Sequence, residues 1–129
     1  MITSKFKTFK LLIDNILVSE CGYNIEDADE FFNEKYISIY NLKTIEQYRG
    51  KGYSKILLND LFNYVKHNLK INIITLIVYK NNINALNLYF SSGFEIFMEY
   101  DDSYSLMKKL KPSIFWWFFI LYILYENKF

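Results

Sequence analysis

The sequence predicts an α/β fold in which helices flank a mixed β-sheet. Several short segments carry apolar and β-branched residues in alternation or in unbroken runs, as strands do, whereas residues 53–69 repeat them every three or four positions, as a helix does. In chain order these patterns give β-β-β-α-β-α-β-β, and interleaved strands and helices are typical of a sheet covered by helices. The 129-residue chain is long enough for one domain with its own core.

Three strands are predicted before the first helix. The first two are rich in apolar and β-branched residues and flank Asp14 and Asn15, a good turn pair, so they predict a hairpin. An acidic segment at 26–34 is expected to be a loop or a short helix, and the alternating segment after it predicts the third strand. The three predicted strands span 6–14, 16–25 and 35–45.

Two helices and three further strands follow. The first helix gathers its apolar residues on one face, namely Leu57, Leu58, Leu61, Phe62, Val65 and Leu69. The unbroken apolar run at 71–79 predicts a strand buried on both faces. Asn82 is a candidate cap for a short helix at 83–91 that ends at Gly93. The last hairpin is predicted at 94–100 and 104–110.

Pro112, the only proline, separates a domain at 1–111 from a tail at 112–129 that contains SIFWWFFILYILY. As a helix at 1.5 Å per residue this run would span about 20 Å, short of a hydrocarbon core of about 30 Å. A transmembrane anchor is therefore less favoured than burial against the domain, contact with a second copy in a homodimer, or a peripheral membrane contact through 113–125.

Composition excludes several classes of function. The net charge is +1 and the basic residues are spread along the chain, which argues against nucleic-acid binding. The single cysteine, Cys21, excludes an intrachain disulfide and a Cys-rich zinc site, and it fits a reducing, cytoplasmic compartment. His67 is the only histidine, so a Ser-His-Asp or Cys-His site has little support, and no metal site is expected.

The stretch IEQYRGKGYSKILLNDL, residues 45–61, is the most distinctive in the chain. Two of the four glycines, Gly50 and Gly52, lie where the predicted strand turns into the helix. Such a turn presents unpaired N–H groups and the positive end of the helix dipole to an anion. Basic side chains add positive charge at Arg49, Lys51 and Lys55. Taken alone, the stretch is better read as an ordinary turn with solvated basic residues, because short glycine motifs recur by chance.

A second segment, NNINALNLYFSSGF at 81–94, favours the anion site. It contains the pattern Asn-x-x-Ala-x-x-x-Tyr followed by Gly-Phe, formed by Asn82, Ala85, Tyr89, Gly93 and Phe94. The first stretch contains Gln-x-x-Gly-x-Gly, from Gln47 to Gly52. Together these two motifs resemble those of the GNAT acetyltransferase superfamily, which binds acetyl-coenzyme A, and the resemblance covers about 35–110.

The resemblance implies a cofactor site and a general acid. The turn would hold the pyrophosphate, the end of the preceding strand would lie beside the thioester where it splays from the next strand, and Tyr89 would protonate the departing thiolate. The implied cofactor-binding residues are Leu42, Lys43, Thr44, Gln47, Tyr48, Arg49, Gly50, Lys51, Gly52, Tyr53, Ser54, Asn82 and Tyr89. The alternatives are that Asn82 only caps its helix and that Tyr89 is a core aromatic residue.

The general base and the acceptor are less determined. Glu46 or Glu34, at the two ends of the third strand, is the candidate base, and each is equally well read as a solvated loop end. Asp101 and Asp102, in the turn 99–105, are expected on the acceptor side, where they would attract a cation, although paired Asp residues are also ordinary in turns.

The residues before the third strand leave room only for a hairpin, so the fold is expected to be an N-terminally shortened GNAT sheet with an extra apolar C-terminal segment. The implied function is N-acetyltransferase activity, moving an acetyl group from acetyl-CoA to a primary amine of a small molecule or a protein by direct attack in a ternary complex. The alternative is a catalytically reduced module that binds coenzyme A or a partner protein.

Overall fold

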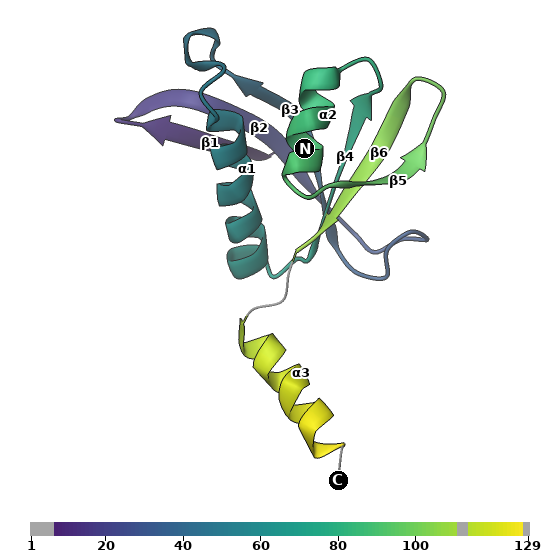
Figure 1. The fold of residues 1–129 in the computed structure, drawn as a ribbon. Helices are drawn as coiled ribbons and strands as arrows, with labels where there is room; N and C mark the ends of the chain where they lie inside the picture. Colours follow the sequence, from purple (N-terminus) through teal and green to yellow (C-terminus); the bar gives the residue numbers. More distant parts are fainter. Residues whose placement is uncertain (1–6, 111–113, 128–129) are drawn as a thin grey trace, which may run out of the picture.

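The computed structural model describes residues 7–110 and 114–127, which form a six-stranded mixed sheet and its helices (Figure 1). The elements are β1 (Lys7–Ile13), β2 (Ile16–Glu26), β3 (Tyr36–Thr44), the 3₁₀ helix η1 (Glu46–Tyr48), α1 (Tyr53–Tyr64), the π-helical turn η2 (Val65–Leu69), β4 (Ile73–Tyr79), α2 (Ile83–Ser91), β5 (Glu95–Glu99), β6 (Ser103–Lys109) and α3 (Ile114–Glu126). The strand order is β1-β2-β3-β4-β6-β5, and only β3 and β4 run parallel. The predicted α/β class with a mixed sheet is confirmed.

The hairpin of β1 and β2 turns at Asp14 and Asn15, as predicted. Both residues have left-handed backbone conformations, with φ of 51° and 66°. A two-residue hairpin turn that follows the strand twist needs this conformation, and Asp and Asn tolerate it better than most residues. After β2 the acidic segment 27–35 forms a loop, which is one of the two forms predicted for it.

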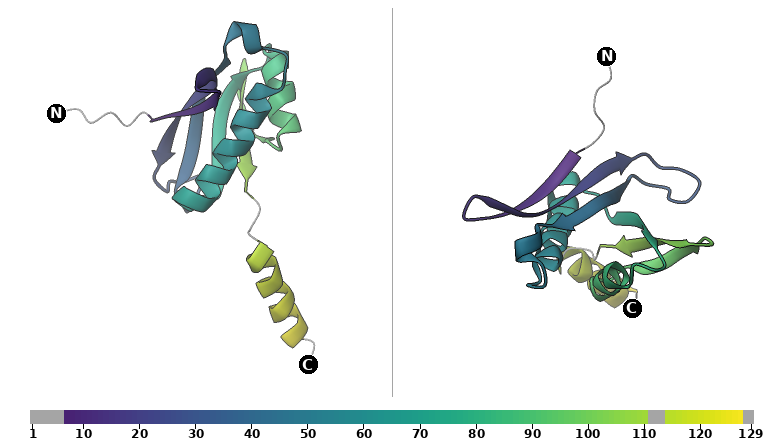
Figure 2. Two further views of the ribbon diagram at one scale, coloured as in Figure 1. Left: turned by 90° about the vertical axis from the view of Figure 1, so that its left-hand side faces the viewer. Right: turned by 90° about the horizontal axis from the view of Figure 1, so that it is seen from above.

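The core lies between the sheet and the two helices α1 and α2, which cover the same face (Figure 2). The apolar face predicted for the first helix is buried as expected, and Leu57, Leu58 and Leu61 have no exposed surface. The sheet meets them with fully buried side chains from three strands, which are Ile37, Ile74 and Leu106. Removing such side chains from water is the main stabilising contribution to the fold.

The prediction for β4 is correct in part. Its first half, Ile73 to Leu76, is buried on both faces, but Ile77 and Tyr79 are 71% and 64% exposed. The alternation in the second half shows that only the face towards the helices is covered there. Beyond Leu76, the last β4 residue that pairs with β3, the face of β4 opposite the helices is therefore uncovered.

The helix α2 begins and ends as its sequence predicts. The side-chain oxygen of Asn82 accepts a hydrogen bond from the Ala85 N–H at 3.3 Å, which caps the first turn. Beyond the last turn Gly93 has φ of 95°, the left-handed conformation that commonly ends helices. A hairpin of β5 and β6 follows, again as predicted.

The tail forms the helix α3, which projects away from the sheet (Figures 1 and 2). Its described side chains, Trp117 to Tyr125, are exposed except for the half-buried Ile120. Burial of the tail against this chain's own domain is therefore wrong for Trp117 and the residues after it. The Trp116 side chain lies outside the described residues. In the described part of the chain, no helix is both long enough and apolar enough to cross a membrane.

Candidate functional site

The parallel strands β3 and β4 separate in the middle of the sheet. They pair at only three positions, Ile37 with Ile74, Ser38 with Thr75 and Ile39 with Leu76, although both strands continue beyond the last pair. The two strands diverge towards the top of Figure 1. The splay that the resemblance implied is therefore present, and it leaves residues 40–44 of β3 beside the opening.

A β-bulge bends β3 just beyond this point. In its pairing with β2, Tyr40 lies opposite Gly22 and Lys43 opposite Glu20, so two residues of β3 face the single residue Cys21. One of the two, Asn41, has φ of 52°. A bulge of this kind increases the local twist and redirects the strand, so it turns the end of β3 away from β4.

The turn between β3 and α1 has the features of an anion site. Gly50 and Gly52 have φ of 76° and 83°, and a Cβ at either position would meet no atom within 4 Å, so the space in front of the turn is open. Gly52 is the N-cap of α1, and no side chain caps the helix. The N–H groups of its first turn are left for an external acceptor, with the helix dipole behind them.

Hydrogen bonds tie this turn to the end of β3. The Thr44 hydroxyl lies 2.6 Å from the Ser54 hydroxyl in α1 and 3.0 Å from the Ser19 hydroxyl in β2. The Arg49 Nε donates to the Thr44 carbonyl at 3.0 Å. These contacts hold the first turn of α1 against the strand whose end lines the splay.

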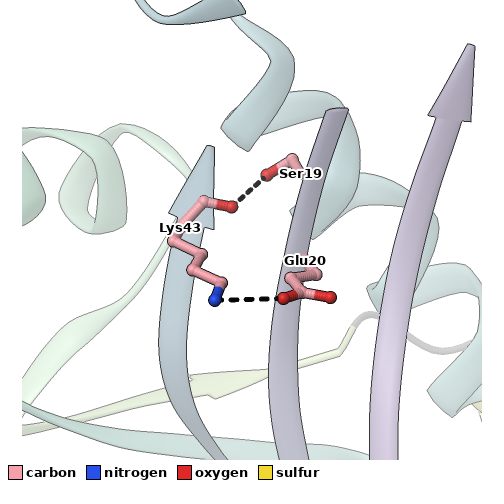
Figure 3. A network of polar contacts seen from close by, with 3 residues as sticks. All are labelled: Ser19, Glu20 and Lys43. Carbon is pink, nitrogen blue, oxygen red and sulfur yellow. Dashed lines mark hydrogen bonds and ion pairs between the residues drawn. The ribbon is translucent and has the colours of Figure 1, made fainter. Parts of the chain in front are cut away.

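Lys43, which pairs with Glu20 of β2, is held by two further contacts. The Ser19 hydroxyl donates to the Lys43 carbonyl at 3.0 Å, and the Lys43 ammonium forms an ion pair with Glu20 at 3.2 Å (Figure 3). Ser19 is fully buried. The residues predicted to lie beside the thioester, Leu42 to Thr44, are thus part of a rigid strand end.

Tyr89 of α2 is buried with 8% of its surface exposed, and its ring packs edge-on against Phe94 at 5.6 Å between centroids. Burial, together with the nearby Cys21 thiol, raises the pKa of its phenol to about 12. Cys21 is the residue opposite the bulge of β3, so the Tyr89 phenol lies towards the bulged end of that strand. No hydrogen bond to this phenol is found among the described residues.

The two candidate bases lie apart from this opening. Glu34 and Glu46 are both exposed, in the loop before β3 and in η1, and neither lines a described pocket near the splay. A third carboxylate, that of Glu26 at the end of β2, lies opposite Tyr36 at the start of β3 and lines the pocket on the open side of the sheet. Its Oε1 accepts a hydrogen bond from the Ser38 hydroxyl at 2.9 Å. Only the register of β2 against β3, which pairs Glu26 with Tyr36, reveals this position.

A pocket of about 380 Å³ lies on the open face over the paired residues of β3 and β4 and reaches Tyr40 and Ile77, just beyond the last pair. Tyr36, Ser38 and Tyr40 line it and alternate along β3 with two core residues, so they point away from α1 and α2. The Tyr40 ring lies over Gly22 of β2, where a Cβ would overlap it. The pocket therefore lies on the side of the sheet opposite the helices and borders the point where β3 and β4 separate.

The loop 27–35 forms one wall of this pocket. Phe31 and Phe32 reach Phe97 of β5, with ring centroids 6.0 Å and 5.1 Å apart. Asp29 holds the loop, because its carboxylate accepts hydrogen bonds from both Phe N–H groups and from the Tyr36 phenol at 2.6 Å. The bond to Tyr36 is the main reason that the pKa of Asp29 is lowered, and it also raises the pKa of Tyr36 to about 12.

The last hairpin turn contributes to the pocket only in part. Tyr100 and Ser105 line it, whereas Asp101 and Asp102 line a separate, shallow depression beside Lys80. The structure therefore does not bring the two aspartates to the pocket at the splay. The described residues also contain no cluster of His, Cys, Asp or Glu side chains able to hold a metal ion.

Comparison with known proteins supports one family. The family model described as "Acetyltransferase (GNAT) family" matches residues 7–94. A segment of 59 residues is 39% identical to the acetyltransferase PseH of Campylobacter jejuni, and it covers 46% of this chain. The same segment spans only 38% of that curated relative.

Solved structures give the same result. The crystal structure of C. jejuni N-acetyltransferase PseH superimposes with a TM-score of 0.68 at 26% identity, over 84% of this chain and 71% of the other. Its complex with acetyl coenzyme A gives 0.69 at the same identity and coverage. The PaiA N-acetyltransferase of Thermoplasma acidophilum in complex with coenzyme A, at 18% identity, gives 0.67 over 81% of this chain and 61% of the other, a likeness of fold alone.

Proposed function

The chain belongs to the acetyltransferase (GNAT) family, and from this premise we propose that it transfers an acetyl group from acetyl-CoA to a primary amine by direct attack in a ternary complex. One observation carries the proposal. The separation of β3 and β4 lies directly beside the uncapped, open N-terminus of α1, so one extended ligand can place its phosphates at the turn and its thioester in the gap.

The residues of the turn fit the pyrophosphate of acetyl-CoA. Its oxygens would accept hydrogen bonds from the N–H groups between Gly50 and Ser54, which the missing Cβ atoms leave accessible. The contacts of Thr44 with Ser54 and Arg49 keep this turn in place before the ligand arrives. The positive ends of Lys51 and Lys55, both exposed, add attraction for the phosphates.

The thioester would lie beside the end of β3. Backbone N–H groups between Leu42 and Thr44 are the proposed donors to the oxygen that becomes negative when the amine attacks. The bulge and the contacts of Ser19 fix this segment, and preorganised donors of this kind lose little free energy through reorganisation during the reaction.

Tyr89 is the proposed proton donor to the departing thiolate. A phenol with a pKa of about 12 is fully protonated at neutral pH, as a donor must be. A free thiol has a reference pKa of about 8.5, so the thiolate is a weaker base than the Tyr89 phenolate and complete transfer of the phenolic proton to it is unfavourable. The phenol therefore acts first by a hydrogen bond to the departing thiolate, and its proton is transferred only as Tyr89 regains one from solvent.

Direct attack is favoured over a covalent intermediate on the protein. The only cysteine, Cys21, is buried in the core, and burial together with the nearby Glu20 carboxylate raises its pKa to about 12. A thiol in that state is a poor nucleophile at neutral pH. The amine itself is then the nucleophile that attacks the thioester.

The test combines binding with turnover on the full chain. Calorimetric titration with coenzyme A is expected to show binding, and a thiol-release assay with acetyl-CoA and a panel of amines is expected to show transfer. An absence of coenzyme A binding overturns the proposal. Binding without thiol release for any amine would instead support the catalytically reduced module, for which the exposed apolar helix α3 is the specific structural argument.

A further inference from the structure

Resting on the proposed acetyl transfer, we propose that the acceptor is a small monoamine whose amino group is attached to an aromatic or similarly flat apolar ring. The ring would bind in the pocket on the open face of the sheet, and Glu26 would receive the proton of the amine. The argument depends on the walls of the pocket, its single carboxylate and its size.

The walls are mainly aromatic. Phe31 and Phe32 on the loop 27–35 pack against Phe97 of β5, and this cluster forms one side of the pocket. The other side carries the ring of Tyr40, held flat over Gly22. Aromatic faces and edges favour another flat ring between them, because offset and edge-to-face contacts are both available.

Glu26 supplies the only negative charge among the described residues that line the pocket. The Ser38 hydroxyl donates to its Oε1 at 2.9 Å, which fixes the carboxylate and leaves the other oxygen for an ammonium group. Ser38 precedes Ile39, the last β3 residue that pairs with β4, so the hydroxyl that holds this carboxylate lies one residue before the splay.

Charge and volume together restrict the class of acceptor. One carboxylate balances one cation, and the further ammonium groups of a polyamine would find no second carboxylate among the described residues that line the pocket. A volume of about 380 Å³ is at the small end of ligand pockets, about 300–1,000 Å³. A compact ring with one amine fits this space better than an extended peptide.

The proton balance of the reaction follows from this placement. Glu26 takes one proton from the bound ammonium and passes it to water, and the neutral nitrogen attacks the thioester carbon, forming the C–N bond. As the C–S bond breaks, the nitrogen gives its second proton to Glu26, and Tyr89 gives its proton to the sulfur. Glu26 then releases this second proton to water and Tyr89 regains one from solvent, so one proton is released overall for each amide and free thiol formed.

The substrate class is tested first by thiol release with acetyl-CoA and three amines: 2-phenylethylamine, butylamine and spermidine. The kcat/KM for 2-phenylethylamine is expected to exceed that of each of the others at least tenfold. Calorimetry with 2-phenylethylamine and the protein saturated with coenzyme A is expected to show binding. If spermidine or butylamine is the better substrate, the inference is wrong but the proposed acetyl transfer stands. If no amine releases thiol, both are wrong.

The role of Glu26 is tested by Glu26→Gln, with Asp27→Asn as a matched control. Asp27 is an exposed carboxylate next in the chain that does not line the pocket. Loss of a general base is expected to lower kcat about a hundredfold. The residual activity should rise with pH as the free amine becomes available, and coenzyme A affinity should not change. A variant with full activity and the wild-type pH profile would overturn the assignment.

The aromatic wall is tested separately by Phe32→Ala. This substitution is expected to raise KM for 2-phenylethylamine several-fold while leaving KM for butylamine and coenzyme A affinity unchanged. An equal change in KM for both amines would show that the wall does not recognise a ring, and would overturn the class of acceptor proposed here.

Discussion

At the scale of single residues, the proposed phosphate turn depends on two glycines whose backbone few other residues adopt. Gly52 has φ of 83° with open space around it, so Gly52→Val places a branched side chain where phosphate oxygens are proposed to bind. The substitution is expected to abolish coenzyme A binding in calorimetry. Left-handed strain costs about 1–2 kcal/mol, less than the stability of about 5–15 kcal/mol of a typical domain, so the fold should survive.

A matched control for this prediction lies at the far end of the first hairpin. Asn15 has φ of 66° in the turn between β1 and β2, so Asn15→Val introduces comparable backbone strain away from the site. This variant should lose stability in a thermal melt but keep its affinity for coenzyme A. A folded Gly52→Val protein with unchanged affinity would contradict the assignment of the turn.

Tyr89 gives the second prediction at this scale. Tyr89→Phe keeps the buried ring and its contact with Phe94 but removes the phenolic hydroxyl group. Turnover is expected to fall about a hundredfold with little loss of coenzyme A affinity, as for other positioned proton donors. The control is Tyr23→Phe, another buried tyrosine of the core, which should leave turnover unchanged. Full activity of Tyr89→Phe would show that this residue is structural.

At the scale of elements, the loop 27–35 is held in place by a titratable group. The hydrogen bond from Tyr36 lowers the pKa of Asp29 below its ordinary 3.8 in the folded protein. A carboxyl group with a depressed pKa contributes stability that is complete above its ordinary pKa and is lost as the pH falls through the folded value. The loop is therefore expected to stay ordered at neutral pH and to loosen only below about pH 3.8.

The measurement is NMR of the Phe31 and Phe32 amides across an acid titration. Their shifts should move together with the titration of Asp29, since both N–H groups donate to that carboxylate. Asp29→Asn keeps a side-chain acceptor but no titrating charge, so the shared transition should vanish in that variant. Two amides that titrate independently would contradict the described loop.

At the scale of the whole molecule, α3 presents more apolar surface than a soluble monomer normally exposes. Eight of its described side chains, from Trp117 to Tyr125 without Ile120, are exposed. Such patches usually mark contacts with other molecules. We therefore predict that the full chain self-associates, and that deletion of 113–129 gives a monomer with an unchanged melting temperature, as measured by light scattering and calorimetry.

Two results would contradict this prediction in different ways. A truncated protein that melts at a markedly lower temperature would show that the tail docks on its own domain after all. A full-length monomer that co-sediments with lipid vesicles, while the truncated chain does not, would show a peripheral membrane contact instead. The vesicles should be tested with and without anionic lipid, because Lys109 before α3 is exposed.

Much of this molecule follows from local patterns in the sequence. The turn at Asp14 and Asn15, the apolar face of α1 and the cap at Asn82 each depend on residues a few positions apart, so they could be predicted. The pocket could not. Its wall joins Phe32 to Phe97, and its carboxylate depends on the register of Glu26 against β3, neither of which has a local signal.

The same reasoning explains why the sequence alone points to carboxylates other than Glu26. Glu34 and Glu46 adjoin the third strand in the chain, and nearness in sequence suggested nearness to the thioester. The structure puts them at exposed ends, while Glu26 comes from the neighbouring strand and reaches Ser38. That Glu26 acts as the base stays a prediction, which Glu26→Gln tests.

Gly22 never lines the pocket, yet the position of the Tyr40 ring depends on it, because a Cβ there would overlap that ring. If the pocket holds the acceptor as proposed, acceptor preference depends on a residue that does not touch it. A single methyl group at position 22 would push the Tyr40 ring into the pocket, so substitution of Gly22 is expected to shift selectivity towards narrower amines.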